Sequence, residues 1–175
     1  MISTVPDTLI TTHLEMTDRS QFKPAYVADE ALQIVELEQV SLDEYLSLYR
    51  AVGEQWHWRD RLVMDRRELR AVLDEATRRI FVLLVDGQTA GYVELDQRGA
   101  EVEIAYFGLI DGFLGRGLGK HLLSFGIEQA WNSEGARRVI VHTCNLDGPH
   151  ALDNYTKRGF RVYHTQQEVM PERYS

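Results

Sequence analysis

The sequence YFGLIDGFLGRGLGKH, residues 106–121, sets a strand, a glycine-rich turn and the start of a helix one after another. The central glycines are Gly115, Gly117 and Gly119. Positions without a side chain let backbone N–H groups approach a ligand closely. The helix that follows begins with unpaired N–H groups and the positive end of its dipole, and Arg116 and Lys120 add positive charge. The segment therefore predicts a cradle for a pyrophosphate group, with a plain flexible turn as the alternative.

Two familiar phosphate-binding motifs do not fit this segment. A Walker A motif needs a glycine five residues before its Gly-Lys pair and Ser or Thr after it, where this chain has Leu114 and His121. The dinucleotide-binding fingerprint needs its third glycine where Lys120 stands, and it follows the first strand of a domain rather than a late one. We therefore exclude both motifs.

The same segment resembles motif A of the general-control N-acetyltransferase (GNAT) superfamily. That motif is Arg or Gln, two residues, Gly, one residue, and then Gly or Ala. Its three defining places hold Leu114, Gly117 and Gly119 in this chain. Leu114 departs from the pattern, which puts one polar contact to the coenzyme A pyrophosphate in doubt and leaves the backbone cradle unaffected.

A second segment, ALDNYTKRGF at residues 151–160, is similar to GNAT motif B. It places a Tyr, three further residues and then Gly-Phe at the end of a short helix. Gly159 suits the position after a helix C-terminus, where φ is positive. The Asn that the family usually has seven residues before the Tyr is Gly148 here. The two motifs occur in the family's order, separated by a helix and a strand, so about residues 31–170 resemble a GNAT domain.

Hydrophobic patterning predicts alternating strands and helices along the chain. The expected elements are a strand at 31–40, helices from 42 and at 65–77, strands at 80–85, 89–95 and 101–109, a helix at 117–132, a strand at 138–144, a helix at 149–157 and a strand at 160–169. Ser41 and Asp65, each followed three residues later by Glu, mark the first two helix starts. The fold class is α/β, as an α+β mixed sheet. The resemblance implies a central, mostly antiparallel sheet with splayed middle strands and helices on both faces.

The expected domain organisation is simple. Residues 1–30 form an N-terminal extension that packs on the domain, and residues 9–16 within it have the pattern of a short strand. Residues 31–175 form a single domain, which agrees with a total length of 175 residues. No repeat or Pro/Gly-rich linker divides the chain.

Composition excludes several classes of protein. The 27 acidic and 19 basic residues give a formal net charge of −8, which argues against non-specific nucleic-acid binding. Cys144 is the only cysteine, so no disulfide forms within the chain. No apolar run is long enough to span a membrane, and the first residues lack a signal-peptide pattern. We expect a soluble cytoplasmic protein, monomeric or homodimeric, without a metal because its six histidines show no paired ligand spacing.

The resemblance implies a function for the predicted cradle. It implies an acetyl-CoA-dependent N-acetyltransferase that passes the acetyl group directly to a primary amine of a small-molecule or amino-acid-like acceptor. Pantetheine would lie between the strand of Phe107–Leu109 and the strand at 138–144, whose backbone groups would orient the thioester carbonyl. The residues implied to bind acetyl-CoA are Phe107, Gly108, Leu109, Gly115, Arg116, Gly117, Leu118, Gly119 and Lys120.

Two residues have implied catalytic roles. Tyr155 fills the place of the family's general acid, with a core tyrosine as the alternative. Glu103, six residues before Leu109, stands where several members place a general base. Its alternative is a solvent-facing strand residue, since alternate residues of this strand share one face. His142 and His150 also suit proton transfer, although histidines at such positions are more often structural.

The acceptor site and a competing function remain open from the sequence. Trp56, Trp58 and Arg61 are expected to line the acceptor pocket, because GNAT acceptors usually meet the first helices and their loop; an aromatic lid packed on the sheet is the alternative. The competing function is a degenerate module that binds acyl-CoA as a sensor or interaction domain. Leu114 and Gly148 favour it, whereas Tyr155 and Glu103 argue against it.

Overall fold

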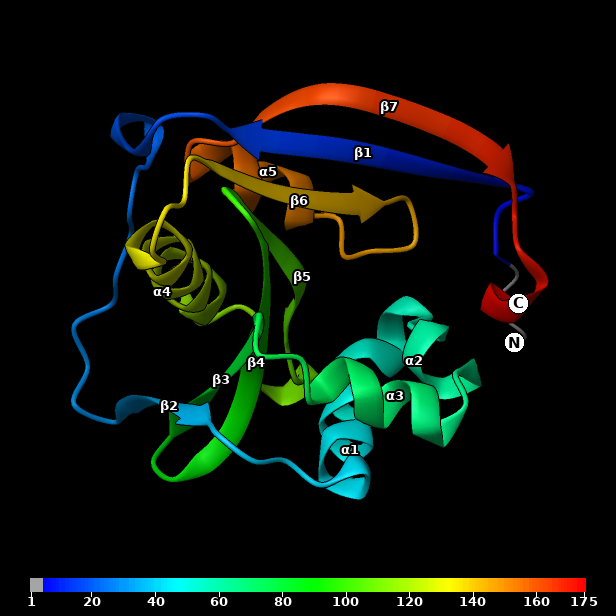
Figure 1. Ribbon diagram of the computed structural model, residues 1–175, viewed down its shortest axis with the longest axis horizontal. Coiled ribbons are helices and arrows are strands. Elements are labelled where there is room, and N and C mark those ends of the chain that lie inside the picture. Colours follow the sequence, from blue (N-terminus) through cyan, green and yellow to red (C-terminus); the bar gives the residue numbers. More distant parts are fainter. Residues whose placement is uncertain (1–4) are drawn as a thin grey trace.

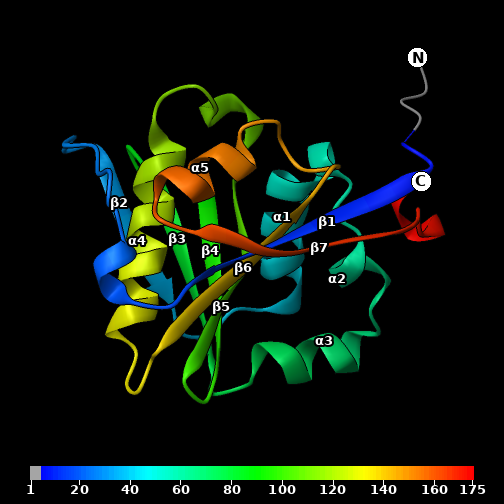
Figure 2. The same cartoon turned by 90° about the horizontal axis from the view of Figure 1, so that it is seen from above.

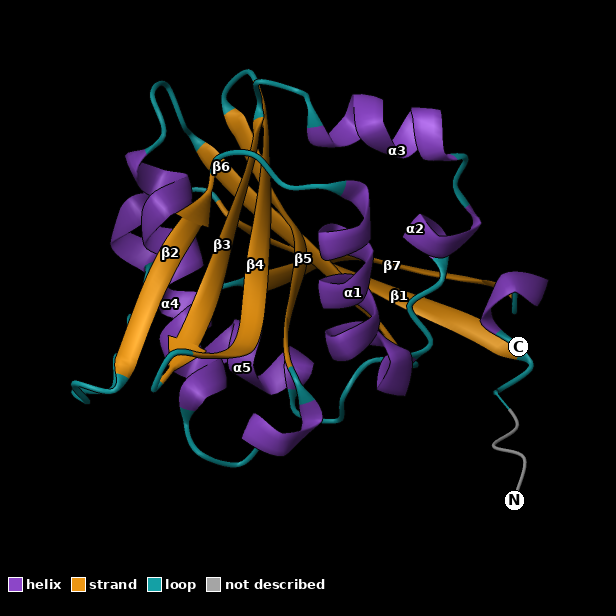
Figure 3. Cartoon of the chain, turned by 90° about the horizontal axis from the view of Figure 1, so that it is seen from below, coloured by secondary structure: helices purple, strands orange, loops and turns teal. Residues whose placement is uncertain are grey.

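The computed structural model describes residues 5–175 as one twisted sheet with helices on both faces (Figures 1 and 3). The strands are β1 (Thr8–Met16), β2 (Leu32–Leu37), β3 (Arg78–Val85), β4 (Gln88–Arg98), β5 (Glu101–Leu109), β6 (Arg138–Cys144) and β7 (Arg161–Val169). The α-helices are α1 (Leu42–Gly53), α2 (Asp60–Val63), α3 (Arg66–Leu73), α4 (Leu118–Asn132) and α5 (Ala151–Lys157). Short 3₁₀ turns are η1 (Arg19–Gln21), η2 (Glu54–Trp56), η3 (Asp111–Phe113) and η4 (Glu172–Tyr174).

The sheet has the strand order β2-β3-β4-β5-β6-β1-β7. Every neighbouring pair is antiparallel except β5 and β6, which are parallel. Helices α4 and α5 lie on one face, and α1, α2 and α3 lie on the other (Figure 3). The expected fold class, a mixed and mostly antiparallel sheet covered on both faces, is confirmed. No helix in this part of the chain is long and apolar enough to cross a membrane.

Side-chain caps set the starts of the two helices on the first face. The Ser41 hydroxyl accepts a hydrogen bond from the Glu44 N–H, and the Asp65 carboxylate accepts one from the Arg67 N–H. Both predicted helix starts are therefore confirmed. The expected end of the second helix near residue 77 is wrong, because α3 ends at Leu73 and the chain turns there so that β3 begins at residue 78.

Strand β3 is buried on both faces, as its continuous apolar run predicts. Phe81 and Leu83 pack in the core cluster that α4 covers. Ile80 and Val82 point the other way, into the cluster that α1 and α3 cover. Burying one such side chain contributes about 1.5–3 kcal/mol, so this strand joins the two halves of the core. The turn that leaves it, at residues 86 and 87, has two positive φ angles, as the Asp-Gly pair predicts.

The first thirty residues contribute a strand to the interior of the sheet. Strand β1 lies between β6 and β7, and Leu14 pairs with Val141 on one side and Val162 on the other. Leu14 and Met16 are fully buried in the core. Strand β1 is therefore more closely associated with the domain than an extension resting on its surface would be. The division of the chain at residue 30 stays a prediction.

The chain after β1 runs along α4 before it enters β2. The Ala25 N–H donates to the Ser124 hydroxyl at 2.8 Å, and the Val27 N–H donates to Nδ1 of His121 at 3.0 Å. Residues 25–27 therefore lie against the first half of α4, close to the glycine-rich turn.

Strands β5 and β6 stay paired over a short distance only. Their parallel pairing joins residues 101–103 to residues 138–140 and includes no further pair among residues 5–175. Next to this point, the register between β4 and β5 shifts and leaves Ala105 as a bulge. A bulge bends the strand that carries it, and β5 and β6 diverge beyond it (Figure 1). Strands β6, β1 and β7 cross the direction of β3–β5 steeply (Figure 2).

We predict that Leu14→Ala lowers the free energy of unfolding by about 2–5 kcal/mol, because it empties a buried site between β6 and β7. Urea denaturation followed by circular dichroism measures this change. Thr12→Ala on the same strand is the control and should cost less than about 1 kcal/mol. Equal, small effects for both variants would show that β1 is a dispensable extension.

Candidate functional site

A cavity of about 710 Å³ opens where β5 and β6 part. Its walls come from the segment between α1 and α2, from β5, from the glycine-rich turn, from β6 and from α5. The predicted site residues that line it are Trp56, Trp58, Arg61, Glu103, Phe107, Gly108, Leu109, Gly115, Gly117, Leu118, Gly119, Lys120 and Tyr155. Arg116 is the one predicted residue outside this lining, and its guanidinium lies 5.8 Å from the centre of the Phe113 ring.

The glycine-rich turn presents free backbone donors to this cavity. Gly115 and Gly117 have φ angles of 77° and 75°, a conformation that L side chains rarely adopt. Gly117 is the N-cap of α4 and makes no side-chain cap, which leaves the first N–H groups of the helix without a capping acceptor. A Cβ placed on Gly115 would find nothing within 4 Å. This arrangement suits a bound anion.

Tyr155 projects from α5 into the core beside the cavity. Its ring packs edge-on against the rings of Phe107 and Phe160, with centroids 6.2 and 6.1 Å away. Burial raises the pKa of Tyr155, and the negative charge of Asp147 raises it further. The hydroxyl is protonated at neutral pH, as that of an ordinary tyrosine is, so its place beside the cavity and not its pKa makes it a candidate proton donor.

Glu103 stands at the last residue pair before β5 and β6 part. It lies opposite Asp96 of β4 and opposite Ile140 of β6, and its half-buried side chain lines the cavity. His142, two residues further along β6 and on the face of Ile140, also lines the cavity with an exposed side chain. Two groups that can accept a proton therefore flank the opening.

The aromatic segment before α2 divides into a packed part and a bridging part. Trp58 packs against the rings of Tyr49 and Tyr106, with centroids 5.4 and 5.1 Å away. Its six-membered ring lies where a Cβ on Gly53 would stand. Trp56 instead reaches across to the loop before α5, where a Cβ on Gly148 would lie 3.2 Å from the indole. Trp58 thus forms a fixed wall, and Trp56 joins two walls of the cavity.

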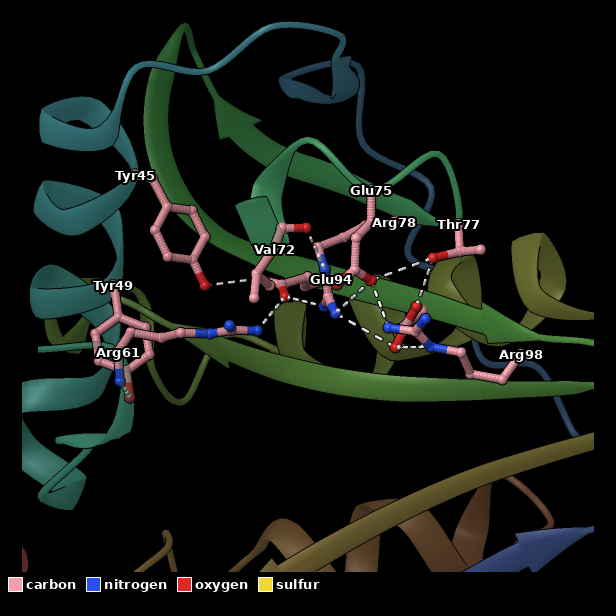
Figure 4. A network of polar contacts seen from close by, with 10 residues as sticks. Tyr45, Tyr49, Arg61, Val72, Glu75, Thr77, Arg78, Glu94 and Arg98 are labelled. Atoms are coloured by element: carbon pink, nitrogen blue, oxygen red, sulfur yellow. Dashed lines mark hydrogen bonds and ion pairs between the residues drawn. The ribbon is translucent and has the colours of Figure 1, made fainter. Parts of the chain in front are cut away.

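A buried ionic network stabilises the wall of the cavity that α1 and α2 form (Figure 4). Glu94 of β4 is 0% exposed and accepts hydrogen bonds from Tyr45 at 2.6 Å, Arg61 at 3.0 Å and Arg78 at 2.5 Å. The Arg61 guanidinium also lies 5.2 Å from the centre of the Tyr106 ring. The network ties α2 to α1 and β3, so Arg61 serves first to hold the segment that carries the tryptophans.

Sequence reasoning did not find Glu94. The only signal was one carboxylate in an otherwise apolar strand, GYVEL at residues 91–95. A carboxylate in such a run must be paired if it is buried.

Comparison with known proteins agrees with this geometry. The sequence model of the acetyltransferase (GNAT) family matches residues 41–160, which is more than half of the chain. The chain belongs to the GNAT acetyltransferase family. The match includes both resembling segments, and the expectation of a GNAT domain is confirmed. A comparison with curated protein sequences gave no match.

Solved GNAT structures share the fold at low sequence identity. A GCN5-related N-acetyltransferase from Kribbella flavida superimposes with a TM-score of 0.63 at 15% identity, covering 89% of this chain and 55% of that one. An aminoglycoside acetyltransferase from an uncultured soil metagenomic sample gives a TM-score of 0.59 at 20% identity, covering 74% and 88%. A conserved protein of unknown function from Staphylococcus epidermidis gives 0.65 at 16%, covering 91% and 60%. This chain therefore spans little more than half the length of two of these proteins.

One departure from the GNAT motifs has a structural explanation. Gly148 stands where motif B usually has Asn, and the Trp56 indole occupies the space over its Cα. A side chain at position 148 would contact Trp56 tightly, and the indole would have to shift by a few tenths of an ångström to admit its Cβ. Leu114, the departure in motif A, lines the cavity with an exposed side chain and offers no polar group.

We predict that Glu94→Gln lowers the free energy of unfolding by about 3–5 kcal/mol, because it leaves Arg61 buried without its counter-charge and leaves Arg78 with Asp96 and Glu75 alone. Chemical denaturation measures the loss. The control is Glu36→Gln, which breaks the half-exposed ion pair with Arg79 and should cost at most about 1 kcal/mol. Similar values for the two variants would contradict a structural role for the buried network.

Proposed function

We propose that this GNAT protein is an acetyl-CoA-dependent N-acetyltransferase that transfers acetyl directly to a primary amine of a small-molecule or amino-acid-like acceptor. One observation carries the proposal: the cavity where β5 and β6 part is lined by both the anion cradle at α4 and Tyr155. The cradle suits a coenzyme pyrophosphate, and Tyr155 suits a departing sulfur.

The residues around the cavity fit a coenzyme A thioester. Beyond residue 103 the edge of β5 that faces β6 has no strand partner, so Phe107–Leu109 can pair with an extended pantetheine chain. The N–H groups at residues 115–120 can hold the pyrophosphate, and the space over Gly115 is open. When bound, acetyl-CoA supplies an activated acetyl thioester.

Three groups of the protein have roles in the proposed acetyl transfer. Glu103 accepts a proton from the acceptor's ammonium group, directly or through water, so that a free amine forms. Backbone N–H groups of β5 stabilise the negative charge that develops on the carbonyl oxygen. Tyr155 holds a proton at its hydroxyl and donates it to the leaving sulfur.

The acceptor side of the cavity favours a cationic amine. Its walls combine Trp56 and Trp58 with the Glu103 carboxylate, and aromatic faces and carboxylates both attract ammonium groups. The soil protein with the same fold is an aminoglycoside acetyltransferase, which supports testing polyamino sugars among the acceptors. A cytoplasmic location and a monomeric or homodimeric state stay predictions.

Two measurements test the function. Isothermal titration calorimetry with acetyl-CoA tests binding, and a thiol-release assay over a panel of amines, amino acids and aminoglycosides tests turnover. We expect binding and release of free CoA with at least one amine. Binding without release for any amine would favour the acyl-CoA sensor, and no binding would contradict both functions.

We predict that Gly117→Val weakens acetyl-CoA binding at least about tenfold, because φ at 75° is strained for a β-branched residue and the turn must rearrange. A Cβ there would lie 3.4 Å from Lys120 and 3.8 Å from Val27, so crowding within the protein is slight. Gly117→Asn is the control, since Asn tolerates this φ better, and it should keep more of the affinity. Wild-type affinity in a folded Gly117→Val protein would contradict the cradle.

We predict that Tyr155→Phe lowers kcat by about 10²–10⁴-fold where the chemical step limits the rate, while acetyl-CoA affinity is kept because the ring remains. Rapid-quench single-turnover kinetics measure this step. Glu103→Gln should differ, with a defect that shrinks as pH rises because the acceptor amine then loses its proton unaided. A wild-type single-turnover rate in Tyr155→Phe would leave Tyr155 as a packing residue.

A further inference from the structure

Arg158, the residue that caps the C-terminus of α5, has a buried charge without a counter-charge. Its side chain lines the cavity and the residue is 8% exposed. Nη1 donates to Oδ1 of Asn154 at 3.3 Å, and Nε is buried with no acceptor. Within residues 5–175 no carboxylate lies at ion-pairing distance of the Arg158 guanidinium. The nearby Asp153 pairs with Lys157.

The other buried arginines are neutralised. Arg61 and Arg78 both contact Glu94, and Arg78 also contacts Asp96 at 3.3 Å. Burial works to lower the pKa of Arg61, but Glu94 and the tyrosines around it together outweigh burial and the pKa rises. Burial lowers the pKa of Arg158, and the nearby Asp153 only partly opposes this. A buried cation without a partner is unfavourable, so its presence calls for an anion.

The position of Arg158 indicates where that anion binds. Asn154, which accepts from Arg158, lies against the first turn of α4: its Nδ2 is 3.7 Å from a Cβ placed on Gly119. The uncapped N–H groups of α4 and the side chain of Lys120 line the same cavity. Arg158 therefore lies on the wall opposite the anion cradle, and the side chain of Asn154 lies between them.

We propose that Arg158 binds a phosphoryl group of the acyl donor, so that the ligand completes an ion pair that the protein lacks. The inference rests on the proposed use of a CoA thioester. Guanidinium groups bind phosphate oxygens through two parallel hydrogen bonds, which suits a phosphoryl group held between α4 and α5. The main chain of Arg158 has a separate role, because its carbonyl accepts a hydrogen bond from the Lys23 N–H. A substitution of the Arg158 side chain leaves that carbonyl in place.

The test is Arg158→Met, which keeps the length of the side chain and removes its charge. Calorimetry compares acetyl-CoA, acetyl-dephospho-CoA and acetylpantetheine, which carries no phosphate. We expect about ten- to a hundredfold weaker binding of acetyl-CoA and unchanged binding of acetylpantetheine. The ligand-free variant should melt at the same temperature as the wild type or higher, because an uncompensated buried charge is gone.

Further comparisons identify which phosphate group Arg158 contacts and control for the general loss of one positive charge. A loss that persists with acetyl-dephospho-CoA assigns Arg158 to the pyrophosphate, which we expect from its place beside α4. A loss confined to acetyl-CoA assigns it to the 3′-phosphate and also supports the proposal. Arg161→Met removes an exposed charge nearby, outside the cavity lining, and should leave both affinities unchanged. Arg158→Lys, which keeps the charge, serves if the Met variant does not fold and should lose less affinity.

Two outcomes overturn the proposal. One is wild-type affinity for acetyl-CoA in Arg158→Met. The other is an equal loss for acetyl-CoA and acetylpantetheine with a lower melting temperature, which would show a packing role. If the wild type itself does not bind acetyl-CoA, the proposed function fails as well, so the two failures are distinct.

Discussion

Parallel strands β5 and β6 pair over residues 101–103 and 138–140, and past that point each has a strand partner among residues 5–175 on one edge only. Unpaired backbone donors and acceptors inside a fold are costly unless something binds them. Here β4 holds β5 from one side, and β1 holds β6 from the other, so the gap between them is fixed rather than collapsed. The cavity, the cradle at α4 and the position of Tyr155 all follow from that gap.

Charge is distributed unequally between the two ends of this gap. On the side of α1 and α2, Glu94 and Asp96 together balance the charges of Arg61 and Arg78, so this wall is internally neutralised. On the α5 side, no carboxylate of residues 5–175 lies at ion-pairing distance of Arg158. An ion pair that is complete without a ligand stabilises the shape of a site. A buried charge without a partner instead favours the binding of a ligand of opposite charge. On this basis, the wall around Glu94 is a scaffold, and the α5 wall is the binding surface that we propose for a phosphoryl group.

Local patterns predicted most elements and failed where the determining contacts are distant in sequence. The capping residues Ser41 and Asp65 and the glycines of the turn act within a few residues, and the sequence alone located them. The place of β1 depends on pairing between residues such as His13 and His142, which no local pattern specifies. The short helix α2 was also missed, because four residues carry too weak a periodicity. The contacts of Glu94 and Arg158 likewise join separate elements and needed the fold to be known.

The two departures from the GNAT motifs need not indicate lost function. At position 148, the missing side chain makes room for Trp56, which joins the aromatic segment to the loop before α5. At position 114, Leu supplies no polar contact, but a guanidinium stands at Arg158 on the facing wall of the same cavity. At the first position Trp56 fills the space, and at the second the proposed phosphate contact of Arg158 would supply the missing polar group. A motif read along the chain cannot register such an exchange, because it compares positions and not the groups that surround a ligand. The groups that surround the cavity, with Tyr155 beside it and open space above Gly115, therefore describe the site more fully than the motif positions alone.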